Sequence, residues 1–279
     1  MIVSHHLSER QKKLIRSLSL PKFRKQEGLF VAEGEKILRE MLPAFRCRLL
    51  VGDQALITPL LEGSVRPIDE VVFLPGAFHF PAISALQNPR PVLALLELPE
   101  PTPAPGLPTT PIVCLDGVQD PGNVGSILRT CSWFGIREVW CSLQTADPYA
   151  PRAVQAGMGA LAYLRVRRTE SLAREIAPLR AAGIPVLGTF LQGQNLYHTE
   201  PLPPGKPFLL VMGNEGKGIS PEVARLTTRQ ITIPALSTPP ETPSIGSDGP
   251  FTMQPGQCES LNVAAAAAVL LSKLSDPSL

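Results

Sequence analysis

The chain has little that would support a metal centre or a disulfide framework. Its 279 residues include five cysteines, which are far apart and form neither a Cys-x-x-Cys pair nor a cluster with histidine: Cys47, Cys114, Cys131, Cys141 and Cys258. Structural zinc sites and disulfide scaffolds need closer, paired spacing. We therefore predict no metal site and a reducing compartment, with Cys114 and Cys141 as small core residues of apolar runs.

Long hydrophobic runs are also missing. A bilayer span needs about 18 apolar residues, whereas the longest run of small apolar residues, 263–271, has about half that length and is rich in alanine. This run favours a buried helix. The N-terminus has no apolar core behind its charges and no small-residue cleavage site, so it does not resemble a secretory signal. We expect a cytoplasmic protein that does not bind membranes.

Acidic residues are absent from one strongly basic stretch. Residues 10–25 contain seven basic side chains and no acidic one: Arg10, Lys12, Lys13, Arg16, Lys22, Arg24 and Lys25. Such uncompensated charge is typical of a surface that contacts a nucleic-acid backbone. A solvated helix face is the alternative interpretation, and charge alone does not decide between the two.

Residues 1–98 alternate between helical and strand patterns, which predicts a small α/β domain. Apolar residues at helical spacing begin at Leu7, with Ser8 or Ser4 available as the N-cap. The expected strands lie at 29–31, 48–51, 71–74 and 91–98, and a helix is expected at 33–42. Proline recurs through residues 99–111, and because it disrupts helices and sheet ladders alike, we predict an extended linker there.

Residues 112–279 repeat a pattern of strand, glycine-rich turn and helix, which predicts a parallel sheet flanked by helices. The expected strands lie at 112–115, 138–141, 161–166, 186–190, 208–212 and 230–233, and the helices at 124–134, 171–182, 221–226 and 261–274. One stretch interrupts the pattern. Residues 235–259 contain five prolines and three glycines with almost no apolar periodicity, so we expect a long, mobile loop.

Three short stretches at predicted strand-to-helix junctions combine small residues with groups able to do chemistry: 123–130, 212–220 and 260–262. In the first, Gly125 permits close backbone approach, and Arg129 can grip a phosphate through two hydrogen bonds. In the second, glycines surround Glu215 at the carboxyl end of a strand, where parallel sheets bind ligands. Taken singly, each stretch also has an ordinary explanation as a turn, a helix cap or an exposed helix surface.

Two familiar nucleotide-binding loops can be excluded, one for the stretch 212–220 and one for the stretch 123–130. A phosphate-binding loop of the GxxxxGK[ST] type would need a lysine after Gly218, where the chain has Ile219. A dinucleotide-binding loop would need GxGxxG at the start of a helix, and Gly122 and Gly125 do not supply that spacing. We therefore expect a small-ligand site of another kind.

Taken in this order, the three stretches resemble the motifs of the SpoU (TrmH-type) branch of the SPOUT RNA methyltransferases, and the resemblance covers essentially the whole chain. Residues 22–35 are similar to a substrate-binding domain that many members carry, with a small α/β fold also seen in certain ribosomal proteins. The resemblance implies a C-terminal parallel-sheet domain with a deep trefoil knot, although true knots are otherwise rare. It also implies S-adenosylmethionine as the methyl donor and a homodimer that completes each active site.

The reaction implied by the resemblance is methyl transfer to a ribose 2′-hydroxyl of RNA. By motif position, the residues implied at the reaction centre are Asn123, Arg129, Glu215, Ser260 and Asn262. Those implied at the donor pocket are Gly188, Thr189, Gly213, Ile233 and Leu261. From the basic stretch, the residues predicted to bind RNA are Lys12, Lys13, Lys22, Arg24 and Lys25.

The chemistry of this reaction fits these residue types. A sulfonium donor is already activated, so an enzyme must align an in-line displacement and remove a proton from a weakly acidic hydroxyl, without a metal. The family's usual proposal makes the equivalent of Arg129 the base. Because a guanidinium is effectively always protonated, holding an RNA phosphate is the alternative role. Glu215 could accept or relay the proton, or position its neighbours.

The sequence also bears on the choice of RNA substrate and on two alternatives to ribose methylation. Ribosomal RNA is the preferred substrate, because the N-terminal domain resembles those of enzymes that modify it, with transfer RNA as the alternative. A non-catalytic RNA-binding or assembly protein of the same fold would be consistent with the insertion at 235–259, where the family usually has only a handful of residues. Methylation of a base is disfavoured by the SpoU-type motifs.

Overall fold

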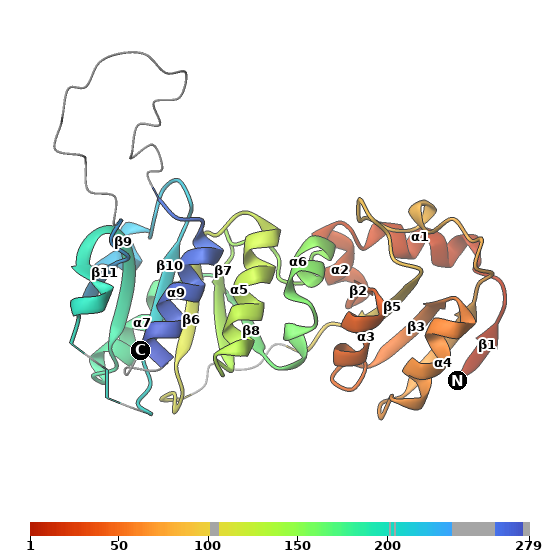
Figure 1. Ribbon diagram of the computed structural model, residues 1–279, viewed down its shortest axis with the longest axis horizontal. Coiled ribbons are helices and arrows are strands. Elements are labelled where there is room, and N and C mark those ends of the chain that lie inside the picture. The colour runs from red at the N-terminus through yellow and green to blue at the C-terminus, as the bar shows by residue number, and fades with distance from the viewer. Residues whose placement is uncertain (101–105, 201, 204, 236–259, 276–279) are drawn as a thin grey trace, which may run out of the picture.

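The computed structural model describes residues 1–100, 106–200, 202–203, 205–235 and 260–275. It contains two sheets, one toward each end of the elongated molecule (Figure 1). The described part of the predicted linker, residues 99–100 and 106–111, forms neither helix nor strand. The insertion predicted as a mobile loop, at residues 235–259, lies outside the described residues except for Ala235.

The N-terminal sheet has five strands in the order β1-β4-β3-β5-β2. Its strands are β1 (Ile2–Ser4), β2 (Leu29–Glu33), β3 (Cys47–Gly52), β4 (Ile68–Phe73) and β5 (Val92–Glu97). Strands β1, β3 and β4 are parallel, and β5 runs antiparallel to both β2 and β3. The accompanying helices are α1 (Glu9–Ser17), α2 (Pro21–Glu27), α3 (Glu35–Met41) and α4 (Gln54–Glu62).

The start of α1 shows how the local sequence specifies these elements. Ser8 is the N-cap, and it forms a capping box in which the Ser8 side chain accepts from the backbone of Gln11 while the Gln11 side chain accepts from the backbone of Ser8. Two N–H groups at the helix start are thereby satisfied. The apolar face of α1 places Ile15 in a buried cluster between the helices and one face of the sheet. Of the two predicted caps, Ser8 is the one that is used.

The C-terminal sheet has six strands in the order β11-β9-β10-β6-β7-β8, all parallel. These strands are β6 (Ile112–Asp116), β7 (Glu138–Ser142), β8 (Arg165–Thr169), β9 (Val186–Asn195), β10 (Leu209–Gly213) and β11 (Arg229–Thr232). The helices of this part are α5 (Pro121–Trp133), α6 (Pro151–Gly157), α7 (Leu172–Ala181), α8 (Pro221–Ala224) and α9 (Val263–Ser275). The predicted α/β class with a parallel sheet is confirmed.

One predicted strand, at 161–166, is displaced. The apolar residues there form a short 3-10 helix at Ala160–Ala162 and bury Leu161 and Leu164 in the core. The strand that follows, β8, is the basic sequence Arg165–Thr169 at the edge of the sheet, paired only with β7. An edge strand can be polar because one side of it is solvated, so counting apolar residues placed the strand too early.

Helices α5 and α6 pack against each other at unusually close range, and Gly125 makes this possible. A Cβ atom at Gly125 would overlap the carbonyl oxygen of Ala153 in α6. Helix α9 also packs against α5 and lies in front of β6 and β10 (Figure 1). The start of α5 is thus held between α6, α9 and the sheet, which limits the motion of the residues at its N-terminus.

The two halves of the molecule share one hydrophobic core. A single cluster of buried side chains includes Phe30, Ile37 and Met41 from the N-terminal half and Tyr149 and Leu161 from the C-terminal half. Helix α6 lies between α5 and α2 at this junction (Figure 1). Within the described ranges, no helix is both long enough and apolar enough to cross a membrane.

Candidate functional site

The first and second motifs lie side by side because β6 and β10 are neighbouring parallel strands. Gly213 at the end of β10 is in register with Asp116 at the end of β6. Two hydrogen bonds join the loops that follow: the Asn214 side chain donates to the Gly117 carbonyl at 2.8 Å, and the Ser220 amide donates to Asp116 Oδ2 at 2.8 Å. Both loops therefore leave the same edge of the sheet as one connected unit.

A chain of side-chain hydrogen bonds then connects all three motifs. Asn262 Nδ2 donates to Asn123 Oδ1 at 3.0 Å, and Asn123 Nδ2 donates to Glu215 Oε1 at 3.0 Å. The second carboxylate oxygen, Glu215 Oε2, accepts from the backbone N–H of Gln119 at 3.3 Å. Residues separated by 139 positions in the sequence thus meet at one point. The amide of Asn123 is held from both sides, so its donor faces the carboxylate and its acceptor faces Asn262.

Helix caps fix the positions of the two asparagines. Asp120 is the N-cap of α5, and its Oδ1 accepts from the Asn123 backbone N–H at 2.9 Å, with Pro121 at the first helical position. Asn262 Oδ1 accepts from the backbone N–H groups of Ala264 and Ala265 at 2.9 and 3.3 Å, at the start of α9. Both helices therefore direct their N-termini, where partial positive charge is concentrated, toward the Asn123–Glu215 contact.

The loop that carries Glu215 is a tight turn. Asn214 and Gly218 exchange two backbone hydrogen bonds of 2.9 Å, and Asn214 Oδ1 accepts from the amides of Gly216 and Lys217, each at 2.9 Å. The chain folds back so closely that a Cβ atom at Gly213 would overlap the backbone of Gly218. Glu215 and Lys217 are exposed on the outside of this turn.

Arg129 lies apart from this hydrogen-bonded chain. It is exposed on α5, and among the described residues its guanidinium has no hydrogen bond or ion pair. Arg129 comes six residues after Asn123, about one residue short of two helical turns, so it lies on a different side of α5, the side that also carries Trp133. Ser260 is exposed and lies two residues before Asn262. The structure thus brings together Asn123, Glu215 and Asn262 and places Arg129 elsewhere on α5.

Three of the five predicted donor-pocket residues, Gly188, Thr189 and Gly213, lie on the neighbouring strands β9 and β10, and a fourth, Ile233, directly follows β11. Gly188 in β9 pairs with Val211 in β10 and with Gln230 in β11. Residues 189–193 then have no partner on β11, because the register resumes only at Gln194. Gly213 ends β10 and Ile233 follows β11. The fifth residue, Leu261, is 52% exposed and precedes Asn262.

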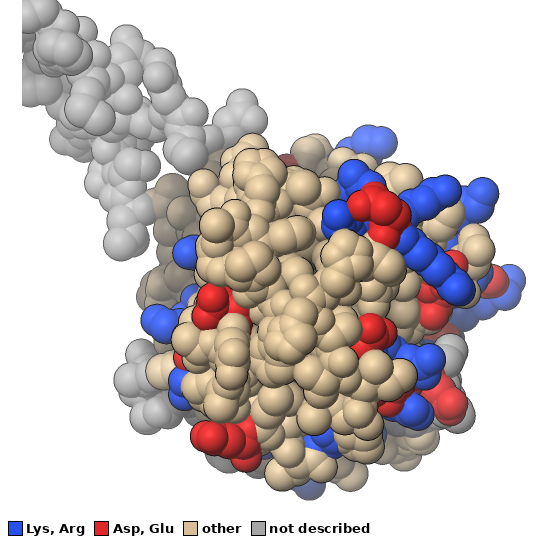
Figure 2. All heavy atoms as spheres, turned by 90° about the vertical axis from the view of Figure 1, so that its right-hand side faces the viewer, with Lys and Arg blue, Asp and Glu red and all other residues tan. Residues whose placement is uncertain are grey.

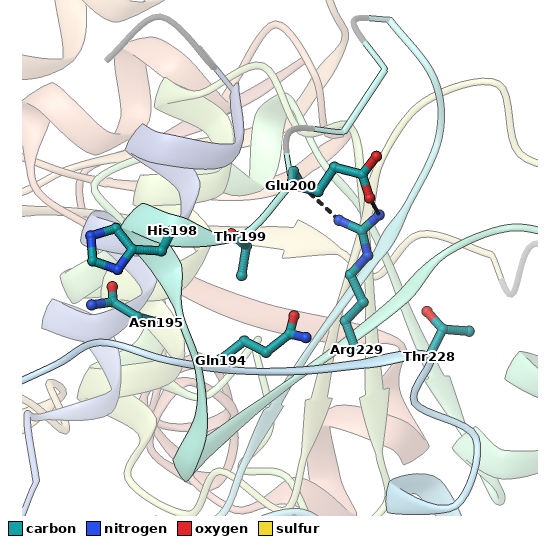
Figure 3. Close-up of a pocket in the computed structure, with 7 residues that line it drawn as sticks. All are labelled: Gln194, Asn195, His198, Thr199, Glu200, Thr228 and Arg229. Carbon is teal, nitrogen blue, oxygen red and sulfur yellow. Dashed lines mark hydrogen bonds and ion pairs between the residues drawn. The ribbon is translucent and has the colours of Figure 1, made fainter.

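A cavity of about 620 Å³ lies elsewhere, at the β11 edge of the sheet (Figure 3). Its lining residues are polar: Gln194, Asn195, His198, Thr199, Glu200, Thr228 and Arg229. Across it, Arg229 donates to the Glu200 backbone carbonyl at 2.7 Å and pairs with the Glu200 carboxylate at 3.5 Å. None of the residues predicted to bind the donor lines this cavity, so it is distinct from the predicted pocket.

The described part of the chain contains no group of three or more His, Cys, Asp or Glu side chains that could hold a metal ion. Four cysteines are buried and unpaired: Cys47, Cys114, Cys131 and Cys141. Burial raises the pKa of the Cys47 and Cys141 thiols to about 12. These thiols are therefore protonated at neutral pH and act as core residues, not as nucleophiles.

The basic stretch is divided by the fold. Lys13, Lys22 and Lys25 are exposed, whereas Lys12 is partly buried and pairs with Glu9 at 2.7 Å. The prediction that Arg24 binds RNA is wrong, because its side chain is 2% exposed and is paired with Asp147. On the N-terminal end of the molecule, Lys and Arg side chains gather along one side, and the middle of that face is mostly uncharged (Figure 2).

Two residues of the site were given no role from the sequence. Neither Asn214 nor Asp116 was predicted to bind a ligand, yet both hold the two loops together. The Asn214 side chain donates to the Gly117 carbonyl, and the Asp116 carboxylate accepts from the Ser220 amide. Asp116 could have been identified as the polar residue that ends a strand of apolar residues. The role of Asn214 depends on how its own turn closes, and no local pattern indicates this.

The Glu215 contact can be tested through stability. Replacing Glu215 with Gln puts an N–H₂ group opposite either the Gln119 amide or the Asn123 amide, so one hydrogen bond is lost. We expect the free energy of unfolding to fall by about 1 kcal/mol, measured by urea denaturation. Glu170→Gln is the matched control, since Glu170 is exposed, and it should change stability by less than about 0.5 kcal/mol. Equal effects of the two substitutions would contradict the contact.

Comparisons with known proteins agree with this geometry. The model of the "SpoU rRNA Methylase family" matches residues 110–244. The 23S rRNA (guanosine(2553)-2'-O)-methyltransferase RlmP of Bacillus subtilis is 28% identical over 93% of this chain and 93% of its own. A solved structure assigned to the TrmH family of RNA methyltransferases, from Porphyromonas gingivalis, is 44% identical with a TM-score of 0.79, over 96% of this chain and 98% of that one.

A third match is the structure of an rRNA methyltransferase from Sinorhizobium meliloti with AdoMet bound. It has a TM-score of 0.75 and 27% identity, over 99% of this chain and 98% of that one. The alignments extend over both halves of the chain, so the N-terminal half is included in the likeness. Together with the identity and coverage of the Porphyromonas structure, they show that the chain belongs to the SpoU (TrmH-type) family.

Proposed function

We propose that this protein is an S-adenosylmethionine-dependent RNA methyltransferase that modifies a ribose 2′-hydroxyl. One observation carries the proposal: the hydrogen-bonded chain Asn262–Asn123–Glu215 unites the three motifs at the carboxyl edge of a parallel sheet, where such sheets bind ligands. The 2′-O-methyltransferase RlmP matches this chain over 93% of both sequences. Fold and site therefore support the same activity.

The residues of the predicted donor pocket suit a ligand of this kind. Gly188 and Gly213 lie on the neighbouring strands β9 and β10, and Ile233 directly follows β11, the other neighbour of β9, so their backbones can contact one ligand together. Two large apolar side chains nearby in sequence are exposed: Leu191, two residues after Thr189, is 72% exposed, and Leu261 is 52% exposed. Such side chains can cover an adenine ring. S-adenosylmethionine supplies a methyl group that is already activated by its sulfonium. The contribution of this chain is binding and alignment.

The reaction centre must hold the ribose and remove its 2′-hydroxyl proton. Glu215 is an acceptor with two exposed oxygens, and Asn123 is oriented by Asn262. We assign to Glu215 and Asn123 the positioning of the hydroxyl, with the carboxylate able to take or relay its proton. Arg129 has no hydrogen bond or ion pair among the described residues, and a guanidinium binds phosphate through two hydrogen bonds, so we assign to it the binding of an RNA phosphate.

Ribosomal RNA is the substrate that we propose. The support is the RlmP match, since that relative is a 23S rRNA enzyme and the alignment includes the N-terminal half of this chain. On that half, we propose that Lys13, Lys22 and Lys25, which are exposed, contribute to RNA binding along the basic side of the face in Figure 2. This substrate would be met in the cytoplasm, which we propose as the location.

We also propose that two copies associate along α5 and α9. Trp133 at the end of α5 is 85% exposed, an unusual state for so large an apolar side chain. It lies on the same side of α5 as Arg129, which has no hydrogen bond or ion pair within the described part of its own chain. A second copy seated on this side would bury Trp133 and could bring Arg129 to the partner's reaction centre. The C-terminal trefoil knot belongs to the same proposal, supported by the return of α9 to pack against α5.

The function is tested by two measurements on the purified protein. Calorimetry should detect binding of S-adenosylmethionine, and methyl groups should be transferred to ribosomal RNA. The modified nucleotide is found by mapping 2′-O-methyl sites in total RNA from cells with and without the gene. Absence of donor binding would refute the enzyme and favour a non-catalytic RNA-binding protein. Methylation of transfer RNA alone would refute the substrate but not the chemistry.

The role of Arg129 is tested by Arg129→Ala. Because the side chain is exposed and has no partner in the described ranges, the fold should not change, while the transfer rate should fall by about 100-fold or more. The donor dissociation constant should change by less than about twofold, since Arg129 is not among the donor-binding residues. Arg174→Ala, also on an exposed helix position, serves as the control. Near-normal turnover of Arg129→Ala would contradict the assigned role.

The dimer is tested by Trp133→Glu. A charge placed in a buried apolar interface is unfavourable, so light scattering should show the mass of a single chain where the unchanged protein shows twice 30.0 kDa. Val65→Glu is the control, because Val65 is an 83% exposed apolar residue in the N-terminal half, between α4 and β4. If the unchanged protein is already a monomer, or if Trp133→Glu remains a dimer, this interface is wrong.

A further inference from the structure

Arg24 is the most completely enclosed charged side chain among the described residues. It lies on α2 and is 2% exposed. Its Nε and Nη2 atoms donate to one carboxylate oxygen, Asp147 Oδ2, at 2.9 and 2.6 Å. Its Nη1 atom donates to the backbone carbonyls of Leu18 and Ser19 at 2.7 and 2.9 Å. The guanidinium is therefore held on both sides, by its own half of the molecule and by the C-terminal half.

Asp147 is equally constrained in the C-terminal half. It lies in the segment between β7 and α6 and is 15% exposed. Its other oxygen, Oδ1, accepts from the Tyr149 amide at 3.0 Å and lies 3.8 Å from Arg168 of β8. The carboxylate is thus already oriented by its own half of the molecule. It presents one free oxygen to Arg24, so the pair forms only in one relative placement of the two halves.

Two further contacts cross the same junction. The rings of Phe30 in β2 and Tyr149 lie 5.0 Å apart between centroids. The Tyr163 hydroxyl donates to the carboxylate of Glu40 in α3. An apolar contact tolerates small rotations, whereas a buried ion pair with four hydrogen bonds does not, because every misplaced donor leaves a buried charge unpaired. Of the two directional contacts, the Tyr163–Glu40 hydrogen bond is exposed to water, so the buried Arg24–Asp147 pair contributes most to a specific placement.

This junction leads directly to the reaction centre. Helix α6 begins four residues after Asp147, and its Arg152 pairs with Asp120 at 3.2 Å. Asp120 is the N-cap that holds the Asn123 amide. A shift of the segment at Asp147 would therefore move α6, and α6 packs tightly on α5 at Gly125.

We propose that Arg24 is a positioning residue, which through Asp147 locks the N-terminal domain to the catalytic domain at a fixed distance from the reaction centre. This inference rests on the proposed function. RNA bound by the exposed basic residues of the N-terminal domain then lies at a fixed distance from the reaction centre. The Arg24–Asp147 pair thereby determines which nucleotide of the bound RNA reaches Asn123 and Glu215. The basic stretch accordingly has two tasks: exposed lysines bind, and the buried arginine sets the geometry.

The test combines a distance and a rate. Spin labels on Val65→Cys, which is in an 83% exposed position, and Arg137→Cys report the separation of the two domains, in a Cys258→Ser background. Labelled chains are diluted with unlabelled protein so that only distances within one chain are measured. Asp147→Asn should broaden the distance distribution and lower kcat/KM for RNA by roughly 10- to 100-fold. The affinity for S-adenosylmethionine should change by less than about twofold, since the donor residues lie on other strands.

The matched control is Arg167→Met. It breaks a half-buried ion pair, Arg167–Glu175 at 2.7 Å, that lies entirely within the C-terminal half. Its distance distribution and kcat/KM should stay within about twofold of the unchanged protein. The double variant Arg24→Met with Asp147→Leu removes both buried charges together, so it should remain folded and still show the broadened distribution and the reduced kcat/KM.

Two results would overturn the proposal. One is a narrow, unchanged distance distribution in Asp147→Asn and in the double variant. The other is a broadened distribution with normal kcat/KM and normal choice of nucleotide, which would make the junction merely structural. Failure of the unchanged protein to methylate RNA would refute the proposed function instead, and the distance measurement would still decide whether Arg24 locks the domains.

Discussion

The site depends on the adjacency of β6 and β10 in the middle of a parallel sheet. Because the two strands are in register at Asp116 and Gly213, their following loops emerge together, and the Asn214 and Ser220 hydrogen bonds join them. Asn123 and Glu215 can then meet although 92 positions separate them in sequence. Asn262 completes the chain from the start of α9. At the start of α9, Asn262 both caps the helix and takes part in the site, whereas at the start of α5 the cap Asp120 holds the backbone of the site residue Asn123.

The second constraint is the junction between the two halves. One hydrophobic cluster extends across it, and hydrophobic contact supplies the free energy of association without fixing orientation. Orientation needs directional contacts, which the buried Arg24–Asp147 pair supplies. Stability and geometry are thus provided by different residues. A substrate that touches both halves would benefit, because the entropy of aligning them has already been lost during folding.

The sequence predicted the fold class and the three motifs, since strand-turn-helix alternation and glycine clusters are local patterns. It failed where burial overrides local composition. Arg24 looks like its exposed neighbours Lys22 and Lys25 in sequence, and only the approach of Asp147, 123 positions away, makes it a core residue. Helix α4 was missed because Pro59 lies within it, yet burial of Ile57 and Leu60 stabilises it. Helix α6 was missed because its seven residues are specified by packing on α5.

Arg129 shows why a single chain does not account for every predicted site residue. Asn123, Glu215 and Asn262 are oriented by hydrogen bonds within the chain, whereas Arg129 is on another side of α5, exposed and without a partner among the residues that the structure describes. A guanidinium left free in this way is suited to a partner that arrives from outside, since it loses no existing contact on binding. Phosphate is such a partner, and so is the reaction centre of a second copy approaching along the side of α5 that carries Trp133. The two alternatives are compatible, because a phosphate bound at an interface would be gripped by Arg129 from one copy while Asn123 and Glu215 of the other hold the ribose.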